Sequence, residues 1–156
     1  MRVCRRRANG MSLLELLLVM ALVALAGTLA VAAYSGGLDG VRMRGSAKEI
    51  AAQLRYTRAQ AIASGQMQRF EIDPQQRRWR AAGARQGRVP DAVEIGFIGA
   101  REVQPGPGTG AIVFFEDGGS TGGRVRLASG GAVWQVDVAW LTGEVTLSRL
   151  SVEGVR

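Results

Sequence analysis

The chain has 156 residues and a formal net charge of +7 at pH 7, which leaves room for one modest domain and an additional helix. It contains no histidine and one cysteine, Cys4, so Cys/His metal sites, Ser-His-Asp or Cys-His catalysis and an intrachain disulfide are excluded. Four of the 20 basic residues lie among the first ten residues, and without them the balance is 16 basic against 13 acidic residues. The positive charge is therefore weak evidence for nucleic-acid binding.

An apolar run follows the leader cations Arg5, Arg6 and Arg7. From Leu16 to Ala33 the chain has 18 residues without a charge or a proline. As a helix, this run would extend roughly 27 Å, close to the thickness of a bilayer core. A basic cluster before such a run indicates a membrane segment whose N-terminal side stays in the cytoplasm.

A single carboxylate, Glu15, stands at the start of this apolar segment. A charge at the centre of a membrane helix costs roughly 2.5–3.5 kcal/mol, and less near the helix end. A cleaved secretory signal ending near Val31-Ala32-Ala33 stays an alternative, but such a signal gains nothing from the carboxylate. Cleavage between Gly10 and Met11 would create an amine about one helical turn from Glu15. That amine can pair with Glu15 in the same chain or in a neighbouring copy.

The segment Gly10-Met11-Ser12-Leu13-Leu14-Glu15, after a short basic leader, resembles the class III signal of type IV pilins and type II secretion pseudopilins. Met11 stands where that family usually has Phe. The resemblance implies that a prepilin peptidase cuts after Gly10 and methylates Met11, and that Glu15 is the assembly carboxylate. It also implies a leader at residues 1–10 and a transmembrane and assembly helix at residues 11–34.

Glycines follow the apolar run at Gly36, Gly37, Gly40 and Gly45. Each costs a helix about 1 kcal/mol relative to Ala, so they predict a bend or local unwinding. Ser46, with Glu49 three residues later, predicts a fresh helix start at a capping box.

This second helical segment, within residues 35–64, is predicted to be amphipathic and to stop at Gly65. Apolar residues at steps of three and four predict one buried stripe: Ala47, Ile50, Ala51, Leu54, Ala61 and Ile62. Lys48, Arg55 and Arg58 are predicted on the solvated face.

The remaining residues, 65–156, are predicted to be rich in β-strands. Strands are expected within 67–73, 77–82, 92–100, 111–117, 123–129, 133–140 and 144–150. Alternation in 123–129 turns Arg124 and Arg126 outward, and alternation in 133–140 places Trp134, Val136, Val138 and Trp140 on one face. A long helix packed on an antiparallel sheet is an α+β architecture, which is also the type IV pilin-like fold that the resemblance implies.

Two glycine-rich stretches are candidates for ligand-binding loops. Residues 104–111 lack the lysine and the helix start of a phosphate loop. Residues 114–123 carry only the adjacent acids Glu116 and Asp117, whereas a calcium loop needs several alternating oxygen donors. Both stretches are predicted to be turns, Asp137 is predicted to be solvated or paired with a surface arginine, and neither a cofactor, a metal nor an enzymatic activity is expected.

Residues 114–127 and 134–145 resemble the C-terminal part of H-type minor pseudopilins of type II secretion. Residues 73–110 are unmatched and correspond to a region that varies in that family. FimT-like minor type IV pilins share the general plan and stay the alternative. A version for DNA uptake would need an exposed basic cluster, for which the candidates are Arg77, Arg78, Arg80, Arg85 and Arg88.

The resemblance implies a minor subunit of the pseudopilus, anchored once in the bacterial inner membrane with residues 65–156 in the periplasm. The subunit would link the tip of the pseudopilus to its shaft during export of folded proteins. The implied partners are the I-, J- and K-type minor pseudopilins, the G-type major pseudopilin, prepilin peptidase and exoprotein cargo. Nucleic acid is not expected among them.

Overall fold

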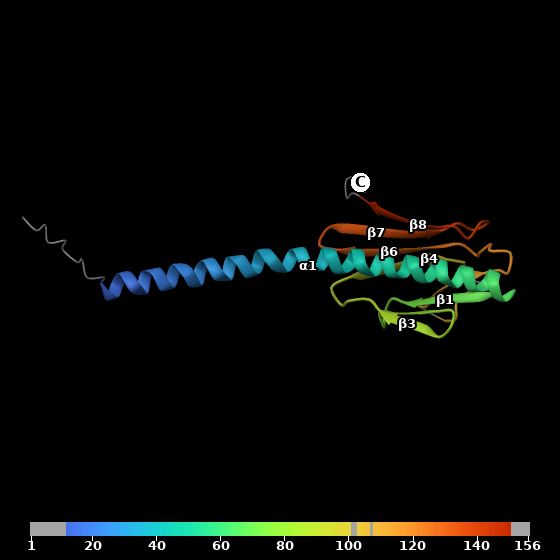
Figure 1. The fold of residues 1–156 in the computed structure, drawn as a ribbon, viewed down its shortest axis with the longest axis horizontal. Coiled ribbons are helices and arrows are strands. Elements are labelled where there is room, and N and C mark those ends of the chain that lie inside the picture. The colour runs from blue at the N-terminus through green and yellow to red at the C-terminus, as the bar shows by residue number, and fades with distance from the viewer. Residues whose placement is uncertain (1–11, 101–102, 107, 151–156) are drawn as a thin grey trace, which may run out of the picture. The chain divides into compact units, whose positions relative to one another are not determined.

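The computed structural model describes residues 12–100, 103–106 and 108–150, and the backbone alone for residues 30–39. The chain divides into two compact units, Met1–Gly37 and Leu38–Arg156. The elements are α1 (Leu13–Ser64), β1 (Gln68–Asp73), β2 (Arg78–Ala81), β3 (Arg85–Arg88), β4 (Glu94–Gly99), β5 (Gly110–Phe114), β6 (Gly123–Ser129), β7 (Ala132–Val138) and β8 (Val145–Leu150) (Figure 1).

The backbone of α1 is helical without interruption, so the predicted local unwinding near Gly36–Gly45 is wrong. A glycine disfavours a helix by about 1 kcal/mol without forbidding it. Met43 and Ala47 are both fully buried on either side of Gly45, so tertiary packing holds this turn in register. For the same reason Ser46 starts no new helix: it lies inside α1 with its side chain buried.

The predicted end of the helix is confirmed, because α1 stops at Ser64 and Gly65 follows with φ +59°. The predicted stripe is also confirmed from Ala47 to Ala61, where the five apolar side chains are fully buried. Ile62 is the exception, at 50% exposed. Ile62 points about 100° away from Ala61 around the helix, and its side chain lies at the border of the buried stripe.

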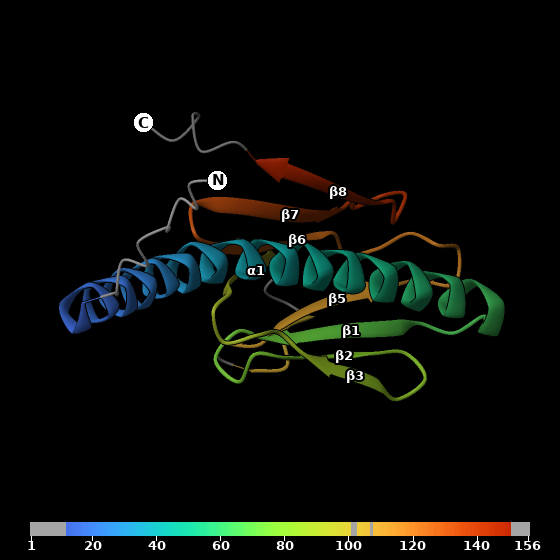
Figure 2. The same cartoon turned by 60° about the vertical axis from the view of Figure 1, so that its left-hand side comes forward.

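The strands of the second unit form two antiparallel sheets, in the orders β3-β2-β1-β5 and β4-β6-β7-β8. The helical segment from Leu38 to Ser64 packs against both, with one sheet along each side of it (Figures 1 and 2). The common core is formed by residues of the helix and of both sheets: Met43, Ile50, Leu54, Phe70, Ile72, Ile112, Phe114, Val125, Leu127 and Val136. The expected α+β class with antiparallel pairing is confirmed.

Strand β3 was not predicted, because its sequence Arg-Gln-Gly-Arg has no apolar alternation. Its position is set by β2, whose Trp79 pairs with Gly87 in the ladder. A Cβ atom at Gly87 would overlap the Trp79 indole, so the strand needs glycine at this point. Trp79 in turn stacks on Phe70, with 6.2 Å between the ring centroids. The region 73–110 thus contains the three strands β2, β3 and β4.

The hairpin of β7 and β8 is confirmed, as is the outward orientation of Arg124 and Arg126. Val136 and Val138 are buried and Trp134 is partly buried against the core. The prediction for Trp140 is wrong, because β7 ends at Val138 and the Trp140 side chain is 72% exposed. The chain turns there, with Gly143 N donating to Ala139 O at 2.9 Å.

Candidate functional site

The N-terminal end of α1 is capped by the residue before it. The hydroxyl oxygen of Ser12 accepts a hydrogen bond from Leu14 N at 3.3 Å, and Glu15 lies exposed in the first helical turn. The partial positive charge of a helix N-terminus favours a carboxylate there. The predicted cleavage residues Gly10 and Met11 and the leader cations Arg5, Arg6 and Arg7 lie outside the described residues.

The spacing of Ser12 and Glu15 is that of a capping box. The same pattern at Ser46 and Glu49 predicted a helix start, whereas none was predicted at Ser12 and Glu15. Glu15 therefore stands where it favours the start of the helix and also lies next to the predicted new chain end.

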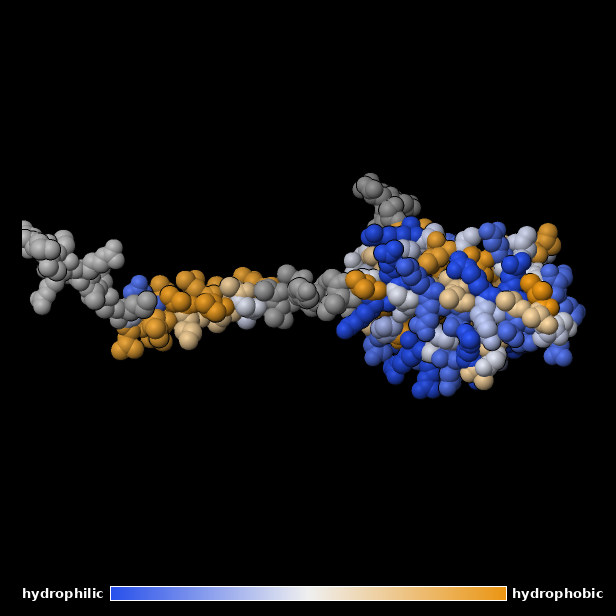
Figure 3. All heavy atoms as spheres, in the orientation of Figure 1, coloured by the Kyte–Doolittle hydropathy of each residue, from blue (hydrophilic) through white to orange (hydrophobic). Residues whose placement is uncertain are grey.

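On the face that Figure 3 shows, the described helical surface after Glu15 is mainly apolar, and consecutive exposed apolar residues continue it around the helix. The exposed large apolar side chains of this segment are Leu13, Leu14, Leu16, Leu17, Leu18, Val19, Met20, Leu22, Val23, Leu25 and Leu29, each between 52% and 83% exposed. A helix that is apolar all round needs an apolar environment or neighbouring helices to cover it. Within the described part of the chain, no helix reaches the combined length and hydropathy of a membrane-spanning segment.

Two turns of the second unit interlock at the point where α1 ends. We call them the turn clasp: residues 115–122, between β5 and β6, and residues 139–144, between β7 and β8. Ser120 Oγ donates to Ala139 O at 3.0 Å, and Ser120 N donates to Trp140 O at 3.1 Å. Gly143 has φ +62°, and a Cβ atom there would overlap the carbonyl oxygen of Gly118.

Two arginines of α1 donate hydrogen bonds at the turn clasp and at the start of β8. Arg58 Nε donates to Gly118 O at 2.9 Å, and Arg55 Nη2 donates to Val145 O at 2.9 Å. The expectation that Arg58 is simply solvated is therefore wrong, because it is part-buried and bonded to the turn clasp. Residues 114–127 and 134–145, which carry the resemblance to H-type pseudopilins, thus meet in space at one junction with the helix.

The two glycine-rich stretches are turns, as predicted. Residues 104–111 lead into β5 through a bridge between Gly106 and Thr109. In the turn clasp, Asp117 Oδ1 accepts from Gly119 N at 2.9 Å, so this carboxylate closes its own turn. Asp137 pairs with Arg124 across β6 and β7, which confirms its predicted surface pairing.

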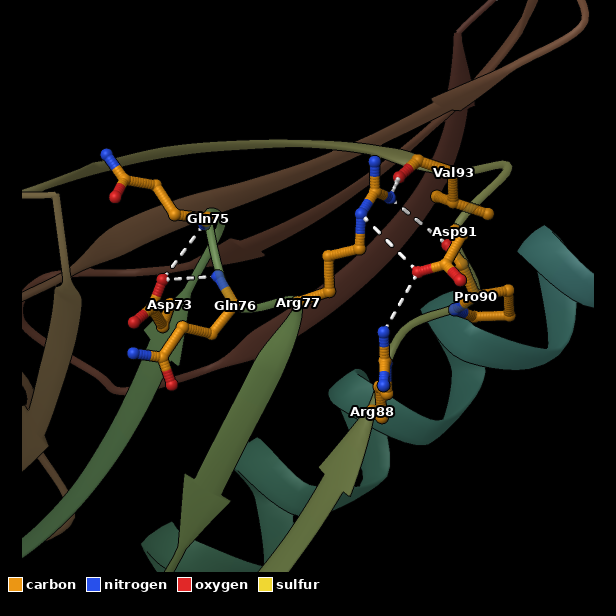
Figure 4. Close-up of polar contacts among 8 residues, drawn as sticks. All are labelled: Asp73, Gln75, Gln76, Arg77, Arg88, Pro90, Asp91 and Val93. Atoms are coloured by element: carbon orange, nitrogen blue, oxygen red, sulfur yellow. Dashed lines mark hydrogen bonds and ion pairs between the residues drawn. The ribbon is translucent and has the colours of Figure 1, made fainter.

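The arginines of residues 77–88 are largely engaged by protein groups. Arg77 Nη1 donates to Pro90 O at 3.2 Å and to Val93 O, and its Nε lies 3.7 Å from the Asp91 carboxylate (Figure 4). Arg88 lies 3.1 Å from the same carboxylate.

Two further arginines of this group also have partners in the chain. Arg80 lies 3.2 Å from Glu71, and the Arg85 guanidinium lies 3.7 Å over the Tyr56 ring. Such pairing, with carboxylates interspersed, does not favour the alternative of a DNA-uptake pilin, which requires an exposed basic patch.

Comparison with known proteins agrees with this geometry. The model of the family "Type II transport protein GspH" matches residues 46–143, and that of the prokaryotic N-terminal methylation motif matches residues 5–31. The type II secretion system protein H of Xanthomonas campestris pv. campestris is 62% identical over 143 residues, covering 92% of this chain and 85% of that protein.

Two solved structures share the fold. The minor pseudopilin EpsH of the Vibrio cholerae type II secretion system has a TM-score of 0.54 at 19% identity, covering 72% of this chain and 98% of that one. The type IV minor pilin FimU of Pseudomonas aeruginosa has a TM-score of 0.52 at 13% identity, covering 68% and 87%. Long helix, antiparallel sheets and methylation motif together define a type IV pilin-like protein. Within that class, the chain belongs to the GspH family of type II transport proteins.

Proposed function

We propose that the protein is the H-type minor pseudopilin of a type II secretion system. The observation that carries this proposal is the 62% identity, over 92% of the chain, to a type II secretion system protein H. Its role is structural: it assembles with other pseudopilins and performs no catalytic step. Assembly would place it between the I-, J- and K-type subunits of the tip and the G-type subunits of the shaft.

Processing and membrane insertion follow from the N-terminal segment. Residues 1–10 form a leader that prepilin peptidase removes on the cytoplasmic side, and residues 11–34 cross the inner membrane once. Residues 35–64 continue the helix and residues 65–156 fold in the periplasm. The uncharged run from Leu16 to Ala33, the apolar surface around the described helix and the leader arginines support this orientation.

Assembly transfers the apolar helix from lipid to neighbouring helices. Glu15 then pairs with the amine of Met11 in the same chain or in an adjacent subunit, and this pair sets the axial register. In a weakly screened environment the energy of such an ion pair depends strongly on the distance between the two charges. Repeated head-to-tail contacts produce an open filament, which can extend beneath a folded exoprotein.

Cleavage and methylation give a direct prediction. The intact mass of the purified mature protein is expected to correspond to a chain that begins at Met11 and carries one added methyl group. Gly10→Val is expected to leave the uncleaved form, because a branched side chain blocks the bond that the peptidase must reach. A mature N-terminus near Tyr34 would instead establish an ordinary secretory signal.

The proposed function itself is tested by deletion. A strain lacking the gene is expected to retain folded exoproteins in its periplasm, and the full-length chain supplied in trans should restore their export. Export that continues unchanged in the deletion strain would contradict the proposal.

A further inference from the structure

Exposed apolar side chains gather on the second unit where α1 ends and the turn clasp lies. We call this the end patch: Ile62, Phe115, Trp140 and Leu141, which are 50%, 37%, 72% and 75% exposed. The face of the second unit that Figure 3 shows is mainly hydrophilic, with scattered apolar residues. Trp is enriched among residues that dominate binding energy at interfaces, so an uncovered Trp beside an uncovered Leu indicates a contact surface.

Glycines bring the parts of the end patch together. A Cβ atom at Gly118 would lie 3.0 Å from Ile62 Cδ1, and one at Gly122 would lie 3.1 Å from the Trp140 Cβ. Neither Gly118 nor Gly122 has a side chain that would cover Ile62 or Trp140. Hydrogen bonds hold the two turns of the turn clasp together, so a partner would meet an ordered surface. Binding would then cost little conformational entropy on this side of the contact.

A groove of about 480 Å³ adjoins the end patch. Its apolar walls are Ile98 and Trp140, and its base includes Gly122 and Gly123. Ile98 is 67% exposed and stands in the same cross-strand row as the Arg124–Asp137 ion pair. This open hollow with apolar walls and one polar pair extends the surface available to a partner next to Trp140.

The charge around the end patch decides what kind of partner fits. Its two turns carry three exposed carboxylates, Glu116, Asp117 and Glu144, and no lysine or arginine, in a chain of net charge +7. The neighbouring cations are engaged by groups of the chain: Arg58 donates to Gly118 O, Arg55 donates to Val145 O, and Arg124 pairs with Asp137. An acidic rim repels an anionic membrane, nucleic acid and the same patch of a second copy. It is complementary to an apolar group flanked by cations.

We infer that the end patch docks a neighbouring pseudopilin subunit through an apolar side chain flanked by lysine or arginine. Trp140 and Leu141 form the apolar centre of the contact, and Glu116 and Glu144 attract the flanking cations. This inference rests on the proposed function, because it takes the partner to be another subunit of the pseudopilus.

Photo-crosslinking in the secreting strain tests it. The full-length chain carries p-benzoylphenylalanine in place of Leu141, or in place of the exposed Gln86 on β3 as the control. Position 141 is expected to give a light-dependent adduct with another pseudopilin, mapped to a peptide with Lys or Arg beside an apolar residue. Adducts with lipid, nucleic acid or a second copy of this chain would overturn the inference, as would equal yields at positions 141 and 86.

Charge reversal supplies the matched comparison. Glu116→Lys combined with Glu144→Lys is expected to lower the yield at position 141 at least tenfold, because the rim then repels the partner's cations. Glu49→Lys combined with Glu94→Lys makes the same change in net charge at two exposed carboxylates outside the turn clasp, and should leave the yield unchanged. Glu94 lies at the other end of β4, roughly 17 Å from Gly99. Equal yields in these variants contradict the inference.

Apolar truncation separates this inference from the proposed function. Trp140→Ser should lower the yield as strongly as charge reversal, and Trp140→Phe should restore most of it. Co-purification of the wild-type chain with other pseudopilins is measured in the same cells. If it persists while Trp140→Ser crosslinks normally, only the end patch is wrong. If the wild-type chain never co-purifies with them, the proposed function fails and the end patch with it.

Discussion

Glu15→Ala is expected to remove the protein from the pseudopilus while leaving it processed and inserted in the membrane. Glu15 lies exposed in the first turn of α1. In an assembly of apolar helices, losing one member of a buried ion pair costs about 3–5 kcal/mol. We therefore expect incorporation to fall roughly a hundredfold or more. The measurement is the amount of mature chain recovered with sheared pseudopili.

Glu49→Ala is the matched control, because it removes an exposed carboxylate from the same helix at a position inside the second unit. Its incorporation should equal that of the wild type. Loss of the Glu15 carboxylate from the first helical turn costs the helix itself only about 0.3–1 kcal/mol, so the processed variant should still begin at Met11 and carry one added methyl group. Normal incorporation of Glu15→Ala would show that the proposed pairing with the Met11 amine plays no part in assembly.

Gly143→Ala is expected to destabilise the second unit by about 3–5 kcal/mol, a large part of the stability of a typical domain. The residue has φ +62°, which costs an alanine roughly 1–2 kcal/mol. In addition, the new Cβ atom would overlap the carbonyl oxygen of Gly118, which accepts the hydrogen bond from Arg58. The two turns would have to separate. Urea unfolding of the detergent-solubilised full-length chain, followed by tryptophan fluorescence, measures the loss.

Gly130→Ala separates the two contributions. Gly130 also has a positive φ, +54°, but nothing lies within 4 Å of where its Cβ would stand. Gly130→Ala should therefore lower the free energy of unfolding only by the backbone cost of roughly 1–2 kcal/mol. If Gly130→Ala and Gly143→Ala lowered the free energy of unfolding equally, the two turns of the turn clasp would be able to move apart and relieve the overlap with Gly118 without cost.

Local patterns in the sequence predicted much of the fold. The alternation in Gln68–Asp73 and Gly123–Ser129, the turn at Thr142-Gly143 and the helix stop at Gly65 all depend on neighbouring residues. Each was predicted correctly, because strand alternation and turn chemistry are properties of a few consecutive residues.

Two errors along α1 have one cause. A capping box was predicted at Ser46 and Glu49, yet the serine that caps the helix is Ser12. The same local pattern occurs at both places, and only the burial of Met43 and Ala47 around Gly45 shows which one lies inside a continuous helix. Glycine preferences of about 1 kcal/mol are small beside the packing of several apolar side chains.

The class of protein was therefore determined by the sequence alone, through the basic leader, Gly10, Glu15 and the apolar run, which are close together along the chain. The tertiary structure decided what depends on residues far apart. It brought Arg58, Gly118 and Gly143 together in the turn clasp, placed β3 against Trp79, and left Trp140 exposed. A contact between residues 60 or 85 positions apart leaves no periodic trace in a sequence, because its geometry exists only once the helix and both sheets have packed around one core.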